Sequence, residues 1–337
     1  MAAETPNTQL SHTIKALQQE LPNVQDKAAL LGLLDKLAQL PQPIRYHYRQ
    51  RWYWCGSGLL LSLLGAILIH YLMAAPELYY VAVAIAVISA IPLLLALANI
   101  HTLNSFTQQL YWKNALLDNQ LTLLNPANWP DTKSWQQQFA EFNRGNHKRE
   151  FRQLIAGQYS GTEHSFSYHY WHFHYVNKRT EVSRNSKGGV RTRTVYDHYD
   201  RYGLLLPFAY CRNLFITSFS TSGIRGERYS SDSGRFNKIF QVRAGEQMQA
   251  ARFLKPAVII ALEEQAAALK QLNLAFVANG MLCISFADKD LLEVKPPCGL
   301  DQLSRFRQSI EQPTSLPKLS QLLHTIHQLL RHSDTNF

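Results

Sequence analysis

Charged side chains are scarce in this chain of 337 residues. Only 17% of residues are charged, although 34 Lys and Arg against 24 Asp and Glu give a formal net charge of +10. Cysteine is scarcer still, with four residues and no close pair, which argues against a disulfide scaffold or a zinc ribbon. The P-loop, the dinucleotide-binding fingerprint, the His-Glu-x-x-His motif and the kinase motifs are all missing. The sequence therefore offers no catalytic residues and predicts no cofactor.

The missing charge is concentrated in two neighbouring blocks. Between Arg51 and Glu77 lie 25 residues without Asp, Glu, Lys or Arg, and between Glu77 and Lys113 lie another 35. An α-helix needs about 20 apolar residues to cross a bilayer. We therefore predict a transmembrane hairpin over residues 51–100, with spans at about 55–73 and 79–98; the alternative is a pair of buried core helices.

The residues that flank the two blocks predict their orientation. Arg45, Arg49 and Arg51 precede the first span, whereas the short connector has no Lys or Arg. Basic residues favour the cytoplasmic side, so we expect a multi-pass protein of the cell inner membrane with both termini in the cytoplasm. Small residues at four-residue spacing predict close packing of the two spans: Gly58, Ser62 and Ala66 in the first, and Ala82, Ala86 and Ala90 in the second. The spans contain no Asp, Glu, Lys or Arg, which favours an anchor over a channel.

The remaining chain predicts an α+β fold in four parts. Apolar spacing indicates N-terminal cytosolic helices over 1–50, a helical connector over 101–156 and C-terminal helices over 296–337. Within the connector we expect the first helix to run from 100 to about 123, and two shorter helices near 132–142 and 147–156. Over 157–295 we predict a basic α+β domain of antiparallel hairpins with packing helices. Its strands are expected at 166–175, 191–202, 213–220, 238–242, 274–278 and 281–286. We also expect a turn at 185–189, a loop at 221–234 and a helix that begins at Pro256.

The positive charge excess lies in one stretch of this domain. Residues 144–243 contain 17 Lys and Arg against 7 Asp and Glu, and the other residues are balanced. Basic groups beside an anionic leaflet are attracted to it, so we predict binding of anionic lipid headgroups or of an acidic protein partner. The alternatives are a solvated face that only maintains solubility, and nucleic-acid binding, which the absence of an RNA-recognition-motif strand disfavours. The candidate residues are Lys178, Arg179, Arg184, Lys187, Arg191, Arg193, Arg225 and Arg228.

Two further clusters have a structural and a functional interpretation. His172 and His174 share a strand face and could meet His198 and either Asp197 or Asp200, but His169 points to the other face, which weakens a metal site. Histidines within an aromatic sheet face are the simpler interpretation.

Cys211 beside Arg212 lacks the neighbouring His of a catalytic thiol. A second candidate ligand-binding set is Arg235, Asn237 and Lys238, where the alternative is the start of a strand between Phe236 and Phe240.

Several segments resemble one bacterial membrane family. They are Ile155–Gly161, Leu214–Phe219, Phe236–Val242, Ala250–Leu262 and Leu274–Ile284, within a likeness that covers residues 45–295. The chain in these segments is similar to the two-span proteins grouped as domain of unknown function 3137. The resemblance implies the same layout, a helical segment, a two-span hairpin and a cytosolic α+β domain, and it implies no catalytic residues.

The sequence as a whole predicts a membrane-anchored binding or scaffold module rather than an enzyme. The hairpin would be the anchor and the basic domain the binding part. Two alternatives stay open: a metal-binding or enzymatic domain that uses the His/aromatic hairpin, and a nucleic-acid-binding domain tethered to the membrane.

Overall fold

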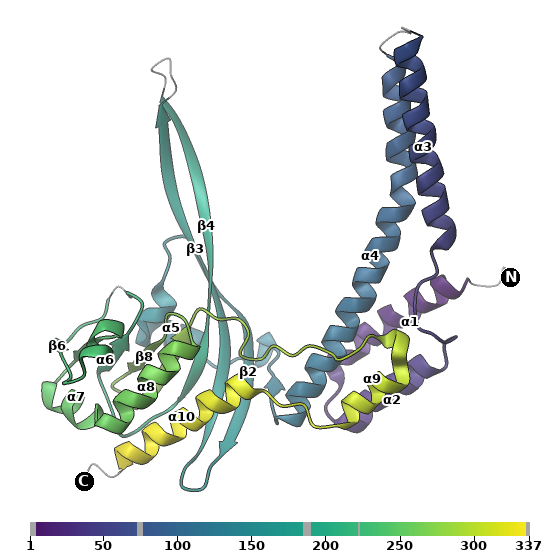
Figure 1. Cartoon of the computed structure of the whole chain (residues 1–337). Coiled ribbons are helices and arrows are strands. Elements are labelled where there is room, and N and C mark those ends of the chain that lie inside the picture. Colours follow the sequence, from purple (N-terminus) through teal and green to yellow (C-terminus); the bar gives the residue numbers. More distant parts are fainter. Residues whose placement is uncertain (1–4, 73–76, 185–189, 222, 335–337) are drawn as a thin grey trace. The chain divides into compact units, whose positions relative to one another are not determined.

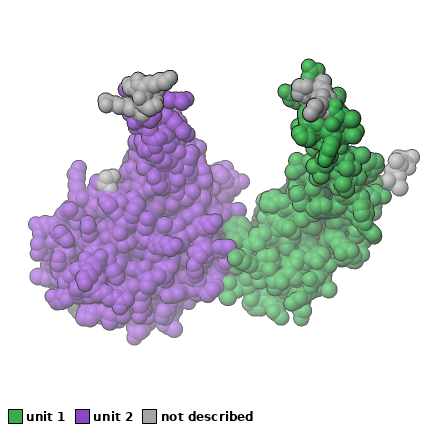
Figure 2. Space-filling model, turned by 45° about the horizontal axis from the view of Figure 1, so that its top comes forward, with its two compact units in different colours: residues 1–118, 294–315 green, residues 119–293, 316–337 purple. Residues whose placement is uncertain are grey.

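The structure is a computed structural model that describes residues 5–72, 77–184, 190–221 and 223–334 (Figure 1). Helices are followed by a large antiparallel sheet, which confirms the α+β class. Two compact units make up the chain, shown in different colours in Figure 2: unit 1 is 1–118 with 294–315, and unit 2 is 119–293 with 316–337. The stretch 296–337 is thus divided between the units, one helix in each.

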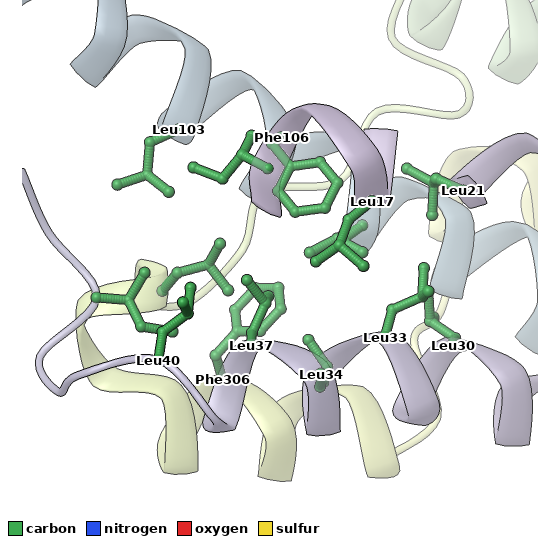
Figure 3. Close-up of a cluster of buried hydrophobic side chains, with 14 of the residues drawn as sticks. Leu17, Leu21, Leu30, Leu33, Leu34, Leu37, Leu40, Leu103, Phe106 and Phe306 are labelled. Carbon is green, nitrogen blue, oxygen red and sulfur yellow. The ribbon is translucent and has the colours of Figure 1, made fainter. Parts of the chain in front are cut away.

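Unit 1 is helical. Its elements are α1 (Pro6–Glu20), the 3₁₀ turn η1 (Leu21–Asn23), α2 (Lys27–Ala38), α3 (Arg49–Tyr71), α4 (Leu78–Asp118), the 3₁₀ turn η4 (Leu300–Gln302) and α9 (Leu303–Glu311). Four of these helices contribute to one apolar core (Figure 3), in which Leu17 of α1, Leu37 of α2, Phe106 of α4 and Phe306 of α9 are each at most 1% exposed. The apolar spacing that predicts helices in the first fifty residues marks the faces that α1 and α2 bury here: Leu10, Ile14 and Leu17 in α1, and Leu30, Leu33, Leu34 and Leu37 in α2.

Helices α3 and α4 are long and apolar enough to cross a membrane. Their most apolar windows are only 6% and 11% buried, whereas the core helix of a soluble protein would be mostly buried. Trp52 and Trp54 at the start of α3 are more than half exposed. Two long apolar helices with this much exposed surface are compatible with a membrane anchor.

The two helices approach closely where the sequence places small residues. Ser62 Oγ donates a 2.7 Å hydrogen bond to the Ala82 carbonyl of α4. A Cβ on Gly58 would lie 2.3 Å from Cβ of Ser89, so only glycine fits there. Close backbone contact of this kind stabilises helix pairs in lipid.

Helix α4 continues without interruption from its apolar part into the unit 1 core. Its C-terminal part contributes Leu103, Phe106 and Leu110 to the core that it shares with α1, α2 and α9. It ends at Asp118, five residues before the expected end, and Gln120 follows with φ of 54°. A left-handed residue of this kind terminates a helix because it cannot continue the backbone geometry.

Unit 2 is built on one nine-stranded antiparallel sheet with the order β1-β2-β3-β4-β9-β8-β5-β7-β6. Its strands are β1 (Thr122–Leu123), β2 (Lys148–Ser160), β3 (Ser165–Arg184), β4 (Val190–Pro207), β5 (Leu214–Thr217), β6 (Glu227–Tyr229), β7 (Gln241–Ala244), β8 (Asn273–Phe276) and β9 (Met281–Phe286). Its helices and 3₁₀ turns are η2 (Pro126–Asn128), α5 (Thr132–Gln138), η3 (Ala140–Asn143), α6 (Gly234–Ile239), α7 (Gln247–Phe253), α8 (Pro256–Ala268) and α10 (Pro317–Asp334).

Both faces of the sheet are covered. On one face, Phe139 and Phe142 of the α5–η3 segment pack against Trp171 and Phe173 of β3. On the other, Phe253 of α7 packs against Phe276 of β8, and α8 and α10 are joined by a 2.8 Å hydrogen bond from Gln265 to Thr325.

Three sequence expectations in unit 2 are wrong. Residues 147–156, expected as a helix, form most of β2, because pairing with β3 outweighs the helix propensity of a polar segment. The expected strand start at 236–240 is helix α6, since Ser233 Oγ caps it by accepting from the Phe236 amide at 3.1 Å. The expected loop over 221–234 contains the edge strand β6. The predicted turn at 185–189 lies outside the described residues.

Candidate anion-binding surface

Strands β3 and β4 extend beyond the rest of the sheet as a two-stranded ribbon (Figure 1). Pairing of β3 with β2 ends at Val176, and pairing of β4 with β9 ends at Tyr202. From residue 177 to 184 and from 190 to 201 the two strands pair only with each other in the described chain. We call these residues the ribbon. Neither outer edge pairs with a further strand in the described chain, although the Asn146 side chain hydrogen-bonds both backbone groups of Lys178. A two-stranded sheet is marginally stable alone, so the ribbon is a natural contact element.

The ribbon's predicted basic residues have different environments. Arg179 donates from Nε to Asp197 Oδ2 at 2.5 Å and also pairs with Glu181, so its charge is neutralised. Lys178, Arg191 and Arg193 are exposed and form no ion pair within the described residues. The register places Arg191 and Arg193 on the same ribbon face as Arg179, and Lys178 on the opposite face. The side chain of Arg184, and Lys187 as a whole, lie outside the described residues.

A second group of arginines lies at the far edge of the sheet, which we call the arginine edge (Arg225, Arg228 and Arg243). Arg228 on β6 is paired in register with Arg243 on β7. Both are exposed, and neither forms an ion pair within the described part of the chain; Arg243 Nη1 donates only to the Gly226 carbonyl, at 3.2 Å. Like charges directly opposite each other destabilise a strand pair. An anion between them would remove that penalty.

A cavity of about 570 Å³ opens beside α7 in unit 2 and contains two further arginines. Arg212 and Arg252 line it together with Tyr210, Phe253 and Glu246. Both arginines are exposed, without an ion pair among the described residues. Sequence reasoning missed these two and Arg243 as candidates, because each is a single arginine in a separate element, a loop, a helix and a short strand.

The second predicted set, Arg235, Asn237 and Lys238, lies on helix α6. The side-chain amide of Asn237 forms two hydrogen bonds with the backbone of Ser231. Its Oδ1 accepts from the Ser231 N–H at 3.0 Å, and its Nδ2 donates to the Ser231 carbonyl at 2.6 Å. Arg235 Nε is 3.4 Å from Glu263 Oε2. These contacts hold the turn before α6, and only Lys238 of the three has no contact of this kind within the described residues.

The histidines of the aromatic hairpin surround a carboxylate. His172 Nε2 and His174 Nδ1 lie 2.8 and 2.9 Å from the same oxygen of Asp200, and His174 Nε2 lies 3.2 Å from His198 Nδ1. Burial would raise the pKa of Asp200, but the hydrogen bonds from His172 and His174 outweigh it and lower that pKa. Of the two carboxylates considered, Asp200 is the one that meets the histidines; Asp197 binds Arg179.

This histidine cluster is a hydrogen-bond network. Both ring nitrogens of His174 are used within it, which leaves no lone pair directed at an open position. In the described ranges, no group of three or more His, Cys, Asp or Glu side chains could hold a metal ion. Burial raises the pKa of the Cys211 thiol to about 12, so that cysteine is not activated as a nucleophile.

A buried charge network supports the base of the ribbon. Arg201 of β4, 2% exposed, donates from Nε to Glu141 Oε1 at 2.6 Å, and Arg144 donates to both Glu141 oxygens at 2.8 and 3.0 Å. Both guanidinium groups also lie over the Phe219 ring, at 4.7 and 5.4 Å. Burial alone would raise the pKa of Glu141, but Arg201 and Arg144 outweigh it and hold that pKa below its ordinary value.

The same network connects the two basic regions. Arg201 is the last ribbon residue of β4, and it also donates to the Ser285 hydroxyl of β9 at 3.1 Å. Arg144 Nη1 donates to the Ser220 carbonyl at 2.9 Å, at the start of the segment that leads to Arg225. Glu141 therefore fixes, through two arginines, both the strand that becomes the ribbon and the segment that leads to the arginine edge.

Comparison with known proteins gives no match: neither a family model, nor a curated protein, nor a solved structure resembles the chain significantly. The resemblance to the two-span family of domain of unknown function 3137 stays a prediction.

Proposed function

We propose that this is a bacterial inner-membrane protein that binds anionic phospholipid headgroups through the ribbon and the arginine edge. Helices α3 and α4 are its anchor, and both termini are cytoplasmic, since Arg45, Arg49 and Arg51 precede the hairpin. The cytoplasmic leaflet is the anionic surface that such a protein meets first.

The observation that supports this most is the placement of unpaired charge. All ten net positive charges belong to residues 144–243. Among the described residues of that stretch, Lys178, Arg191, Arg193, Arg228 and Arg243 have no carboxylate partner. Each basic group near an anionic surface contributes about 1 kcal/mol of attraction. An exposed ribbon with Val182 and Val190 at 64% and 61% exposure suits an interfacial contact better than a solvated face.

The test uses the full chain, because a fragment that starts at residue 100 would lose α1 and α2 and expose Leu103, Phe106 and Leu110. The protein is reconstituted into nanodiscs of phosphatidylcholine alone or with phosphatidylglycerol, and tryptic cleavage after Arg191 and Arg193 is timed. We expect slower cleavage in the anionic discs, and loss of that protection as salt rises.

Two double variants distinguish binding at the arginine edge from a general effect of the protein's net charge. Replacing Arg228 and Arg243 by Gln should reduce the lipid-dependent protection, whereas the matched pair Lys15→Gln and Arg305→Gln, which lies in unit 1, should leave it unchanged. Equal cleavage rates in neutral and anionic discs would overturn the lipid assignment, and would favour an acidic protein partner instead.

A further inference from the structure

A polar cavity of about 470 Å³ lies at the base of the anchor, within unit 1. It is lined by the start of α1, the segment before α3, the start of α3 and one residue of α4: Thr5, Asn7, Thr8, Ser11, His12, His47, Tyr48, Gln50, Arg51 and Asn99. Its volume is within the range of small-molecule sites, roughly 300–1,000 Å³.

The cavity is built from tied elements rather than from a loose surface. Asn7 Nδ2 donates to the His47 carbonyl at 2.9 Å, and the His47 amide donates back to Asn7 Oδ1 at 3.0 Å. Asn99 Nδ2 donates to the buried Tyr48 hydroxyl at 2.5 Å. These bonds hold α1 and α4 against the segment that enters α3, so the walls are formed before any ligand arrives.

The chemistry of the lining favours an anion. Every lining residue within the described ranges is polar, several carry N–H or O–H donors, and none of them is Asp or Glu. The Arg51 guanidinium lies 4.7 Å from the Tyr48 ring centroid and forms no ion pair in the described part of the chain. An arginine held by an aromatic ring, with no carboxylate among the described lining residues, is suited to a phosphate group.

The position of the cavity identifies the source of that phosphate. Arg51 is followed directly by Trp52, Tyr53 and Trp54, all more than half exposed, and then by the apolar part of α3. Aromatic residues of this kind mark the headgroup level of a membrane. A cavity one residue away from them opens where lipid phosphates lie.

We propose that this cavity binds the headgroup of one anionic phospholipid, with Arg51 as the phosphate ligand. The inference relies on α3 and α4 being the membrane anchor, and it is independent of the ribbon and the arginine edge. It assigns the protein a bound lipid in addition to a charged surface.

The test is native mass spectrometry of the full-length protein released from membranes that contain phosphatidylglycerol and phosphatidylcholine. We expect a retained phosphatidylglycerol, and about tenfold weaker retention in R51Q, since a charge-assisted hydrogen bond is removed. R49Q is the matched control, because Arg49 carries the same charge two residues earlier and does not line the cavity. R51K keeps the charge but loses the planar guanidinium over Tyr48, so its retention should lie between those of the wild type and R51Q.

Three outcomes overturn the proposal. R49Q and R51Q could weaken retention equally, which would indicate diffuse attraction. Phosphatidylcholine could be retained as well as phosphatidylglycerol. Inorganic phosphate could stabilise the delipidated protein against heat as strongly as the lipid does, which would assign the cavity to a soluble ion. If no phosphatidylglycerol is retained although α3 and α4 still hold the protein in the membrane, lipid binding in the cavity is refuted and the membrane anchor is not.

Discussion

Arg228 and Arg243 lie directly opposite each other on the antiparallel strands β6 and β7, at the edge of the sheet. Opposed like charges weaken such a pair by roughly 0.2–1 kcal/mol. The edge of unit 2 is therefore less stable than it would be with a neutral pair.

Replacing Arg228 with Gln should thus have opposite effects on stability and binding. The free energy of unfolding should rise by a few tenths of a kcal/mol, because the repulsion with Arg243 is removed. Protection in anionic nanodiscs should fall. Chemical unfolding in detergent and the cleavage assay measure the two effects, and a fall in both would show that Arg228 is needed for folding rather than for binding.

The buried carboxylate of Glu141 should be far more important for stability than its exposed counterparts. Glu141→Gln leaves Arg201 and Arg144 buried without their anion, which costs about 3–5 kcal/mol. The control is Glu150→Gln, whose exposed pairs with Lys148 and Arg152 are worth less than about 1 kcal/mol. Equal losses in the two variants, measured by chemical unfolding, would contradict the role assigned to Glu141.

Low pH should lower the free energy of unfolding through protonation of Glu141. The pKa of Glu141 is lower in the folded state than in the unfolded chain, so its contribution is complete above the unfolded value of about 4.3 and is lost as pH falls through the folded pKa. Stability measured from pH 7 downward should decline below about pH 4, and the gap between wild type and E141Q should narrow there. A gap that stays constant to pH 3 would show that another group is responsible.

Replacement by alanine should have opposite effects on stability at two glycines, Gly203 and Gly32. A Cβ on Gly203 of β4 would lie 1.9 Å from the Ile284 carbonyl and 2.3 Å from the Trp171 ring, so G203A should destabilise by at least about 2 kcal/mol. Gly32 in α2 has nothing within 4 Å of its Cβ position, and G32A should stabilise by about 0.5–1 kcal/mol. Thermal unfolding compares the pair; a neutral G203A would mean that Trp171 can move away.

The helix hairpin offers a similar comparison. G58L should separate α3 from α4, since Ser89 occupies the space beside Gly58, whereas G56L should be tolerated because nothing lies within 4 Å there. We expect a lower melting temperature in detergent for G58L alone. Identical melting curves for both variants would contradict close packing at Gly58.

The sequence predicted elements with a regular pattern and missed those that depend on partners distant in the chain. The leucine stripes of α1 and α2, the aromatic strand β3 and the helix at Pro256 all follow local rules, and the structure confirms them. Strand β2 was missed because its polar residues favour helix in isolation, and only β3 makes it a strand.

The candidate surface was predicted only in part for a related reason. Counting charge located the basic stretch and named Arg225 and Arg228, but it could not show that Asp197 and Glu181 neutralise Arg179. Nor could it show that Arg201, counted with the others, is buried on Glu141 and contributes nothing to the surface. The number of charged residues in a stretch can be counted in the sequence. Which of these charges pair with each other depends on the strand register, which only the structure gives.

Helix α4 is one uninterrupted rod of 41 residues, or about 60 Å at 1.5 Å per residue, and its two ends have different surroundings. The first part is apolar and mostly exposed, whereas the last part packs into the core of unit 1 through Phe106 and Leu110. Pro92 lies within the apolar part, where its missing N–H removes one hydrogen bond from the backbone ladder. On the proposed anchoring in a bilayer, a change in bilayer thickness that tilts the apolar part would act on the helical core of unit 1 through this one helix.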